Sequence, residues 1–202
     1  MSEVFDHRVI PLATVQEPSH IDLIGDGLVD GGLPVVEVGM RGAHGLDAIR
    51  RLSARGDLLV GAGTVRTVPQ AREVIDAGAQ FVVSPGLDDD VVRFVTSAGL
   101  PVIPGVLSPT EVGAAVRLGL RRVKLFPAAA VDATALLTAY AAVFPDVRFM
   151  PSAGVTAASM AGFLSQQAVF AVSGSWITAR AADGSAAVAA AARDAVAVAA
   201  EV

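Results

Sequence analysis

The chain has 202 residues, of which 53% are hydrophobic and 17% are charged, and its formal net charge is -5. This length and apolar content suit one compact domain with a sizeable core, and they exclude an intrinsically disordered or a fibrous chain. An acidic chain of this kind lacks the basic surface that nucleic-acid binding requires. Cysteine is absent, which excludes disulfides, thiolate nucleophiles and thiolate metal sites.

Neither end of the chain indicates export or a membrane anchor. The N-terminal sequence MSEVFDHRVIPL carries acids early and has no apolar stretch of the kind found in a secretory signal. The most apolar segment, Ala187–Val202, is interrupted by Arg193, Asp194 and Glu201, and it is too short and alanine-rich to span a membrane. We therefore expect a soluble, cytoplasmic protein with no membrane or nucleic-acid partner.

Short β-branched runs alternate with longer amphipathic stretches along the whole chain. The runs predict strands at Val9–Val15, Pro34–Met40, Leu58–Val65, Phe81–Leu87, Pro101–Leu107, Arg122–Ala128, Arg148–Val155 and Val169–Trp176. The amphipathic stretches predict helices at Ser19–Gly31, Leu46–Ala54, Val68–Ala77, Val91–Ala98, Glu111–Leu118 and Thr134–Val143, with a last helix at Ala182–Val202. Several helices are followed by a glycine where a C-cap would fall, namely Gly56, Gly78, Gly99 and Gly119.

The predicted strands are almost wholly apolar, which is typical of parallel strands covered on both faces. Eight strand–helix units in a chain of this length predict an α/β fold, a single (β/α)8 TIM barrel that spans residues 1–202. No linker or change of composition divides the chain into two domains. An open, doubly wound sheet is the alternative architecture.

A few polar side chains interrupt the apolar strands. In a barrel, the groups needed for chemistry lie at the C-terminal ends of the strands, so these interruptions mark candidate site residues. They are Glu37, Thr64, Ser84, Lys124, Ser152, Ser173 and Ser175. An ionisable group in such a strand destabilises the fold by several kcal/mol unless it is paired or has a function.

Lys124 is the single lysine among 15 basic residues, since the other 14 are arginine. Arginine cannot replace lysine where a neutral amine is needed, because a guanidinium stays protonated. Apolar neighbours and a nearby arginine disfavour the charged form of Lys124, and a neutral amine can attack a carbonyl to form a Schiff base. Glu37 would then shuttle protons, and Arg41 would bind a substrate carboxylate. The alternative is a purely structural ion pair between Glu37 and Lys124.

Two other kinds of site are not supported by the sequence. Gly61–Gly63 follows a predicted strand, but Arg66 stands where a dinucleotide-binding motif has its third glycine. His7, His20 and His44 show no metal-ligand spacing. We therefore expect neither a nucleotide cofactor nor a metal.

Six short motifs occur in order along the chain: Val36–Arg41, Gly61–Thr64, Ser84–Gly86, Ile103–Gly105, Val123–Ala128 and Gly174–Trp176. Each motif is weak by itself, but together they resemble the family of 2-keto-3-deoxy-6-phosphogluconate (KDPG) aldolases and 4-hydroxy-2-oxoglutarate (KHG) aldolases, which are class I aldolases. The resemblance extends from about Val9 to Trp176. It implies a (β/α)8 barrel that forms a homotrimer and needs no metal or other cofactor.

The resemblance also implies a role for individual residues. Lys124 would be the Schiff-base lysine, Glu37 the general acid/base, and Arg41 and Thr64 the residues that bind the pyruvyl carboxylate. Pro85 would line the pocket within the Ser84–Gly86 segment. The further substrate-binding candidates are Phe126, Ser152, Gly154, Gly174 and Ser175.

The expected reaction is cleavage of a 2-keto-4-hydroxy acid to pyruvate and an aldehyde, with KDPG as the substrate and glyceraldehyde 3-phosphate as the aldehyde. Cleavage of 4-hydroxy-2-oxoglutarate to pyruvate and glyoxylate is an alternative. A phosphate-binding barrel of non-aldolase chemistry and a non-catalytic binding protein are two further alternatives. If the protein is not a catalyst, replacing Glu37 or Lys124 would leave its function intact.

Three departures from the family pattern bear on the substrate. The chain has Ser152-Ala153-Gly154 where a glycine pair is common, Ser173-Gly174 where two glycines are common, and Ala129 where a glutamate is frequent. Glycines let backbone N–H groups approach a phosphate closely, and the loops after the last two barrel strands are the usual phosphate site. The methyl group of Ala153 therefore leaves the choice between a phosphorylated and an unphosphorylated substrate open.

Overall fold

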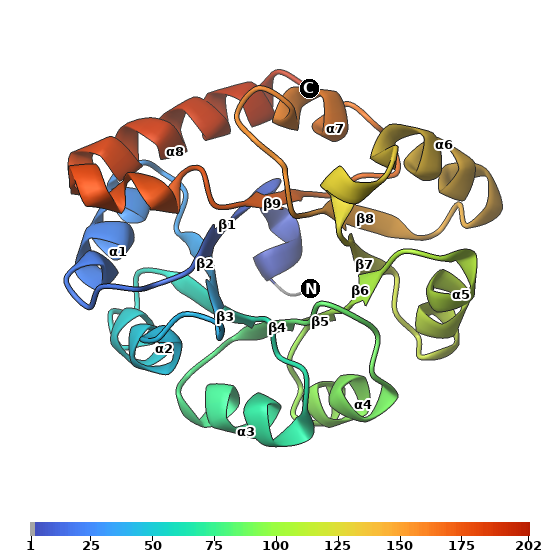
Figure 1. Ribbon diagram of the computed structural model, residues 1–202, viewed down its shortest axis with the longest axis horizontal. Coiled ribbons are helices and arrows are strands. Elements are labelled where there is room, and N and C mark those ends of the chain that lie inside the picture. The colour runs from blue at the N-terminus through green and yellow to red at the C-terminus, as the bar shows by residue number, and fades with distance from the viewer. Residues whose placement is uncertain (1–2) are drawn as a thin grey trace.

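The computed structural model describes residues 3–202, so the first two residues of the N-terminal segment considered above, Met1 and Ser2, lie outside the described residues. All strand pairs within this range are parallel. The strands curl around a common centre and the α-helices lie outside them (Figure 1). The predicted α/β class with a parallel sheet is confirmed.

The strands follow the predicted order, and each is shorter than its predicted segment. They are β1 (Val9–Ala13), β2 (Val35–Gly39), β3 (Leu59–Gly63), β4 (Phe81–Val83), β5 (Val102–Ile103), β6 (Gly105–Val106), β7 (Arg122–Leu125), β8 (Arg148–Pro151) and β9 (Val172–Gly174). The helices are α1 (His20–Asp30), α2 (Gly45–Ser53), α3 (Val68–Asp76), α4 (Asp89–Ser97), α5 (Pro109–Arg117), α6 (Ala133–Val143), α7 (Met160–Leu164) and α8 (Ser185–Ala200). Every predicted strand and helix is represented, and Gly78, Gly99 and Gly119 follow their helices with positive φ, as a C-terminal glycine does.

Several short elements were not predicted. These are α7 and the 3-10 helices η1 (Glu3–Asp6), η2 (Ala128–Ala130) and η3 (Thr178–Asp183). Segments of three to six residues are too short to show a helical hydrophobic period, so sequence patterns do not detect them. Among the described residues, no helix is long and apolar enough to cross a membrane.

The strand ladder is divided into two sheets, which differs from the single continuous ladder that the sequence predicts. One sheet has the order β5-β4-β3-β2-β1-β9 and the other has the order β6-β7-β8. The predicted strand Pro101–Leu107 is split into β5 and β6 at Pro104, because proline has no N–H to contribute to the ladder. Isolated parallel bridges, Phe149 to Val169 and Ser152 to Ser173, connect the second sheet to the strand segment that ends in β9.

The N-terminal helix η1 lies across the middle of the ring of strands in Figure 1. Phe5 of this helix makes an edge-on contact with Phe170, with ring centroids 5.9 Å apart. The guanidinium of Arg122, at the start of β7, lies 5.9 Å and 5.6 Å from these two ring centroids. Burial, together with the charge of Arg148, lowers the pKa of Arg122. The N-terminal end of β7 is therefore covered by aromatic packing, and the opposite strand ends carry the polar residues considered below.

Glu111 closes a capping box at the start of α5. Its Oε2 accepts hydrogen bonds from the backbone N–H of Ser108 at 2.7 Å and of Leu107 at 2.8 Å. The hydroxyl of Ser108 accepts a bond from the Glu111 N–H at 3.3 Å. These backbone donors, that of Ser108 first, hold the pKa of Glu111 below its usual value because they stabilise the carboxylate.

Replacing Glu111 by glutamine is expected to lower the free energy of unfolding by about 1 kcal/mol at neutral pH, because the amide keeps the shape of the cap but loses its charge. The pKa of Glu111 in the folded protein lies below the ordinary value of 4.5 that it has when unfolded. The charge therefore contributes fully above about pH 4.5, and its contribution is lost as the pH falls through the lower folded-state pKa. Urea unfolding across this range checks the sign: the two proteins should converge in acid, and a constant difference would contradict the assignment.

Candidate active site

Two ionisable side chains meet in the interior of the curled strands. Lys124 lies in β7, where its backbone N–H donates to the carbonyl of Pro104 at 2.8 Å, and Glu37 lies in β2. The Lys124 Nζ is 3.4 Å from Glu37 Oε1. Only 5% of Lys124 and none of Glu37 is exposed to solvent. The two residues that interrupt the apolar strand pattern with charge are therefore adjacent and removed from water.

The carboxylate of Glu37 is confined on three sides. Its Oε1 faces Lys124, and its Oε2 accepts a hydrogen bond from Ser173 Oγ at 3.2 Å. A methyl group built on Gly63, at the end of β3, would overlap this carboxylate and come within 2.7 Å of Glu37 Cγ. The close approach of Glu37 to β3 therefore requires glycine at this position.

The aromatic ring of Phe126 lies beside the amine. Its centroid is 5.3 Å from Lys124 Nζ, which is within the range of a cation–π contact. Phe126 follows β7 directly, so the ring and the amine come from the same strand. The ring gives the amine an apolar neighbour.

Two non-glycine residues adopt a left-handed backbone conformation at strand ends. Thr64 follows β3 with a φ of 61°, and Ala153 follows β8 with a φ of 68°. Such values are uncommon outside glycine, and for a β-branched residue they are strained. Strain of this kind concentrates at functional sites. Thr64 is a predicted substrate-binding residue, and Ala153 lies between two others, Ser152 and Gly154.

Arg41 lies at the rim of this site and not in its interior. It is exposed in the loop after β2, and its Nε donates to the hydroxyl of Thr14 at 3.3 Å. Among the described residues, no hydrogen bond or ion pair joins Arg41 to Lys124 or Glu37. The structure thus brings the predicted lysine and glutamate together and leaves the predicted carboxylate-binding arginine on the loop above them.

The remaining predicted substrate-binding residues also stand at the C-terminal ends of strands. Pro85 is half-buried after β4, Ser152 is buried after β8, and Gly174 is the buried last residue of β9. Gly154 and Ser175 are exposed in the loops after β8 and β9. None of these five has a hydrogen bond to Lys124 or Glu37 in the part of the chain that the structure describes.

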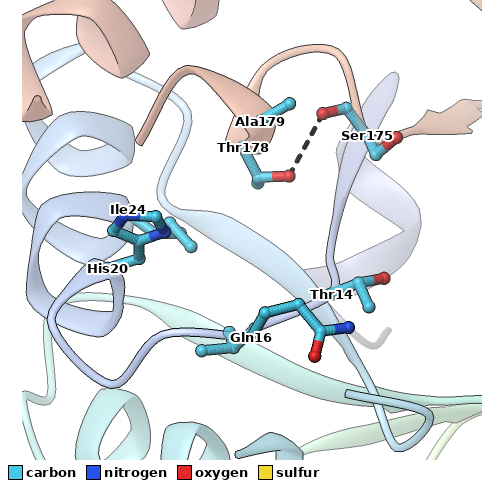
Figure 2. A pocket seen from close by; sticks show the side chains of 8 residues that line it. Thr14, Gln16, His20, Ile24, Ser175, Thr178 and Ala179 are labelled. Carbon is cyan, nitrogen blue, oxygen red and sulfur yellow. Dashed lines mark hydrogen bonds between the residues drawn. The ribbon is translucent and has the colours of Figure 1, made fainter. Parts of the chain in front are cut away.

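A cavity of about 320 Å³ opens between the loop after β1 and the segment after β9. Figure 2 shows His20 and Ile24 of α1 on one side of it and Ser175, Thr178 and Ala179 on the other. The Thr178 hydroxyl donates to the backbone carbonyls of Leu12 at 2.6 Å and Ser175 at 3.3 Å.

The Figure 2 cavity adjoins the rim of the site through one side chain, because Thr14 lines it and also accepts the hydrogen bond from Arg41. A second cavity, of about 290 Å³, is bordered by Gly154 and the start of α6. Ser175 and Gly154 therefore each border open space beside the strand ends.

A family model described as KDPG and KHG aldolase matches residues 2–191. The chain belongs to the KDPG and KHG aldolase family. A Pseudomonas aeruginosa relative named 2-dehydro-3-deoxy-phosphogluconate aldolase is 43% identical over 174 residues, which cover 84% of this chain and 78% of the relative. An Escherichia coli K12 relative named KHG/KDPG aldolase is 36% identical over 170 residues, which cover 84% of this chain and 80% of the relative.

A solved structure of a KDPG aldolase from Legionella pneumophila, with pyruvate captured as a covalent carbinolamine intermediate, is similar to this member of the KDPG and KHG aldolase family. The two chains are 31% identical with a TM-score of 0.90, and the match covers 95% of this chain and 96% of the other. This KDPG/KHG aldolase family member is therefore a carbon–carbon lyase.

The two functional groups that meet in this site are an amine and a carboxylate. Within residues 3–202, no group of three or more His, Cys, Asp and Glu side chains is placed to hold a metal ion. An amine beside a carboxylate in a desolvated interior provides a nucleophile and a proton acceptor at adjacent atoms.

The sequence assigned no role to three residues that shape the candidate site: Ser173, which was a candidate without a role, and Gly63 and Thr14, which were not candidates. Ser173 is a polar residue inside an apolar strand, which marked it as a candidate, but nothing in the sequence indicates that it contacts Glu37. Gly63 lies in one of the sequence motifs, but the sequence does not show that glycine is required there because a side chain would overlap the Glu37 carboxylate. Thr14, the partner of Arg41, had no distinguishing signal.

Proposed function

We propose that this enzyme cleaves KDPG to pyruvate and glyceraldehyde 3-phosphate through a Schiff base on Lys124. The observation that carries the proposal is the 3.4 Å between Lys124 Nζ and Glu37 Oε1 in a buried site, which places a nucleophilic amine beside a proton acceptor. The relatives named KDPG aldolase and the Legionella pneumophila enzyme with its pyruvate carbinolamine support the same chemistry.

The first half of the reaction forms the imine. Glu37 Oε1 accepts a proton from the Lys124 ammonium, and the neutral amine adds to the C2 ketone of the substrate to form a carbinolamine. Glu37 returns that proton to the carbinolamine hydroxyl, which leaves as water and gives a protonated imine, an electron sink, while Glu37 becomes a carboxylate again. Arg41, at the rim, would turn from Thr14 toward the substrate carboxylate, for which its planar fork is suited. Thr64 would hold the other side of that carboxylate.

The second half breaks the carbon–carbon bond. Glu37 accepts the proton of the C4 hydroxyl, the C3–C4 bond breaks, and its electron pair moves into the imine to give an enamine while the aldehyde leaves. Glu37 then returns the proton to C3. Water hydrolyses the resulting imine, which releases pyruvate and regenerates the Lys124 amine. Every proton that Glu37 accepts is delivered again within one turnover.

The loops after β8 and β9 would bind the phosphate end of the substrate. In the described chain, the backbone N–H groups of Gly154 and Ser175 donate no backbone hydrogen bond, and both residues are exposed beside cavities. Free amides at these barrel loops suit a phosphate. Ala153 already holds the left-handed conformation that a glycine would otherwise supply, so its methyl group does not exclude the same loop geometry.

4-Hydroxy-2-oxoglutarate is the second candidate substrate, because the family model covers both activities and the Escherichia coli relative is named for both. Comparing kcat/KM for the two substrates decides between them. A KDPG preference of tenfold or more, which corresponds to about 1.4 kcal/mol, would support the phosphate assignment. Equal values would contradict it.

The proposed function is accompanied by a proposed closed barrel and a proposed assembly. We propose that residues 1–202 form one domain in which β5 and β6 act as a single strand of a closed eight-stranded barrel, with Pro104 interrupting its ladder and the two bridges joining β8 to β9. We also propose a cytoplasmic homotrimer, on the family resemblance. Sedimentation that gives a monomer at micromolar concentration would contradict the trimer.

Trapping with pyruvate and borohydride tests the proposed chemistry directly. Reduction should fix one pyruvate per chain, and peptide mapping should place it on Lys124, because the only other amine in the chain is the N-terminus. Borohydride without pyruvate is the control and should leave the mass unchanged. Absence of an adduct on the folded protein would overturn the Schiff-base mechanism.

A further inference from the structure

Ser173 contacts Glu37, the acid/base of the proposed chemistry, and has no role in the reaction steps described above. Its hydroxyl donates to Glu37 Oε2 at 3.2 Å, and neither residue has any solvent-exposed surface. A hydrogen bond to a buried carboxylate is among the stronger hydrogen bonds in proteins, because water cannot take its place.

The backbone of Ser173 is held from both sides. It pairs with Ile10 of β1 and is bridged to Ser152, which follows β8. The hydroxyl therefore projects from a fixed point. In a curled parallel sheet, alternate strands contribute the side chains of one interior layer. Strand β1 separates β9 from β2, and β8 separates β7 from β9, so Ser173, Glu37 and Lys124 come from such alternating strands.

The two oxygens of Glu37 thus have different partners. Oε1 faces the Lys124 amine, Oε2 faces the Ser173 hydroxyl, and the absence of a side chain at Gly63 of β3 leaves room for the carboxylate. Rotation of the carboxylate would break the bond to Ser173. The arrangement keeps one chosen oxygen directed at the reacting atoms.

We propose that Ser173 is a positioning residue that orients Glu37 for proton transfer. A hydroxyl can donate to a carboxylate and can accept from a carboxylic acid, so Ser173 can hold Glu37 both before and after Glu37 takes a proton. This inference rests on the proposed function, in which Glu37 cycles between these two forms. It predicts that Ser173 affects the proton-transfer steps and not the binding of the keto acid.

The test separates imine formation from proton transfer. Pyruvate in D₂O exchanges its methyl protons only if an enamine forms and is protonated at C3, whereas borohydride trapping needs the imine alone. Ser173→Ala should lower the exchange rate and kcat for cleavage by roughly ten- to a hundredfold, which is the effect of losing one hydrogen bond to a charged group. Its KM for pyruvate and its Lys124 adduct should stay within about twofold of the parent protein.

Matched variants exclude a general loss of structure. Ser173→Thr keeps a hydroxyl and should recover most of the exchange rate, while Ser173→Gly, which cannot overpack the site, should reproduce the alanine result. Thr178→Val removes another buried hydroxyl, one that bonds the carbonyls of Leu12 and Ser175 and does not touch Glu37. Pyruvate carries no phosphate, so its exchange does not depend on the loop at Ser175. Thr178→Val should therefore lower Tm without changing the exchange rate.

A double-mutant cycle with Glu37→Gln distinguishes a role of Ser173 that acts through Glu37 from a purely structural role. If Ser173 acts through Glu37, adding Ser173→Ala to Glu37→Gln should lower the exchange rate by less than about twofold. The inference would be overturned if the two single-variant losses in exchange rate multiplied in the double variant, or if Ser173→Ala and Ser173→Gly exchanged at the normal rate. In both cases the parent protein would still form its adduct. A parent protein that forms no adduct would overturn the proposed function and this inference together.

Discussion

Replacing Lys124 by arginine is expected to lower the rate of aldol cleavage by at least about a thousandfold and to abolish the pyruvate adduct. Arginine keeps a positive charge and a long side chain near Glu37, but its guanidinium stays protonated and cannot add to a ketone. The variant therefore removes the nucleophile while it preserves the charge balance of the buried site. Steady-state cleavage and intact mass after borohydride reduction measure both effects.

The chain offers an unusual control for this experiment, because Lys124 is its only lysine. Arg50 is exposed on α2 and lies outside the site, so Arg50→Lys adds one accessible amine without disturbing the interior. We expect this variant to keep full activity and to carry its adduct on Lys124 alone. Cleavage or a stoichiometric adduct in Lys124→Arg would show that the amine of Lys124 is not the nucleophile.

The second large effect concerns stability. Lys124→Met should lower the free energy of unfolding by about 3–5 kcal/mol, because it leaves the fully buried Glu37 carboxylate without its counter-charge. Adding Glu37→Gln to Lys124→Met removes the remaining charge, and the double variant should regain most of this loss. Urea unfolding of the parent, both single variants and the double variant gives the coupling energy between the two residues.

The sign of this coupling separates two explanations of the buried pair. A pair retained for catalysis should be replaceable without loss of stability once both charges are removed, since an apolar replacement of a buried ion pair is often neutral or stabilising. The double variant would then be stable and inactive. A double variant that stays as unstable as Lys124→Met would instead indicate that the ion pair is part of what holds the strands together.

Much of the fold follows from local patterns. Apolar β-branched runs separated by amphipathic stretches indicated parallel strands and their covering helices, because such strands must be buried on both faces. Pro104, by contrast, lay inside a predicted strand, and its lack of an N–H divided the ladder into two sheets. A sequence pattern marks where strands lie, but the pairing between them depends on individual backbone donors.

The buried pair of Lys124 and Glu37 could also be singled out from the sequence, and its surroundings could not. A lone lysine and a glutamate inside apolar strands are chemically conspicuous wherever they occur, so Lys124 and Glu37 could be singled out without knowing their distance. The hydrogen bond from Ser173 joins residues 136 positions apart, and the glycine requirement at position 63 arises from a carboxylate on the neighbouring strand. Such contacts depend on how the curl and stagger of the strands bring alternate strands to one interior layer, which no local periodicity specifies. The sequence by itself thus indicated the aldolase chemistry, the succession of strands along the chain and two candidate reactive residues. Only the tertiary structure decided how Glu37 is oriented, because that orientation is set by side chains that meet across the interior.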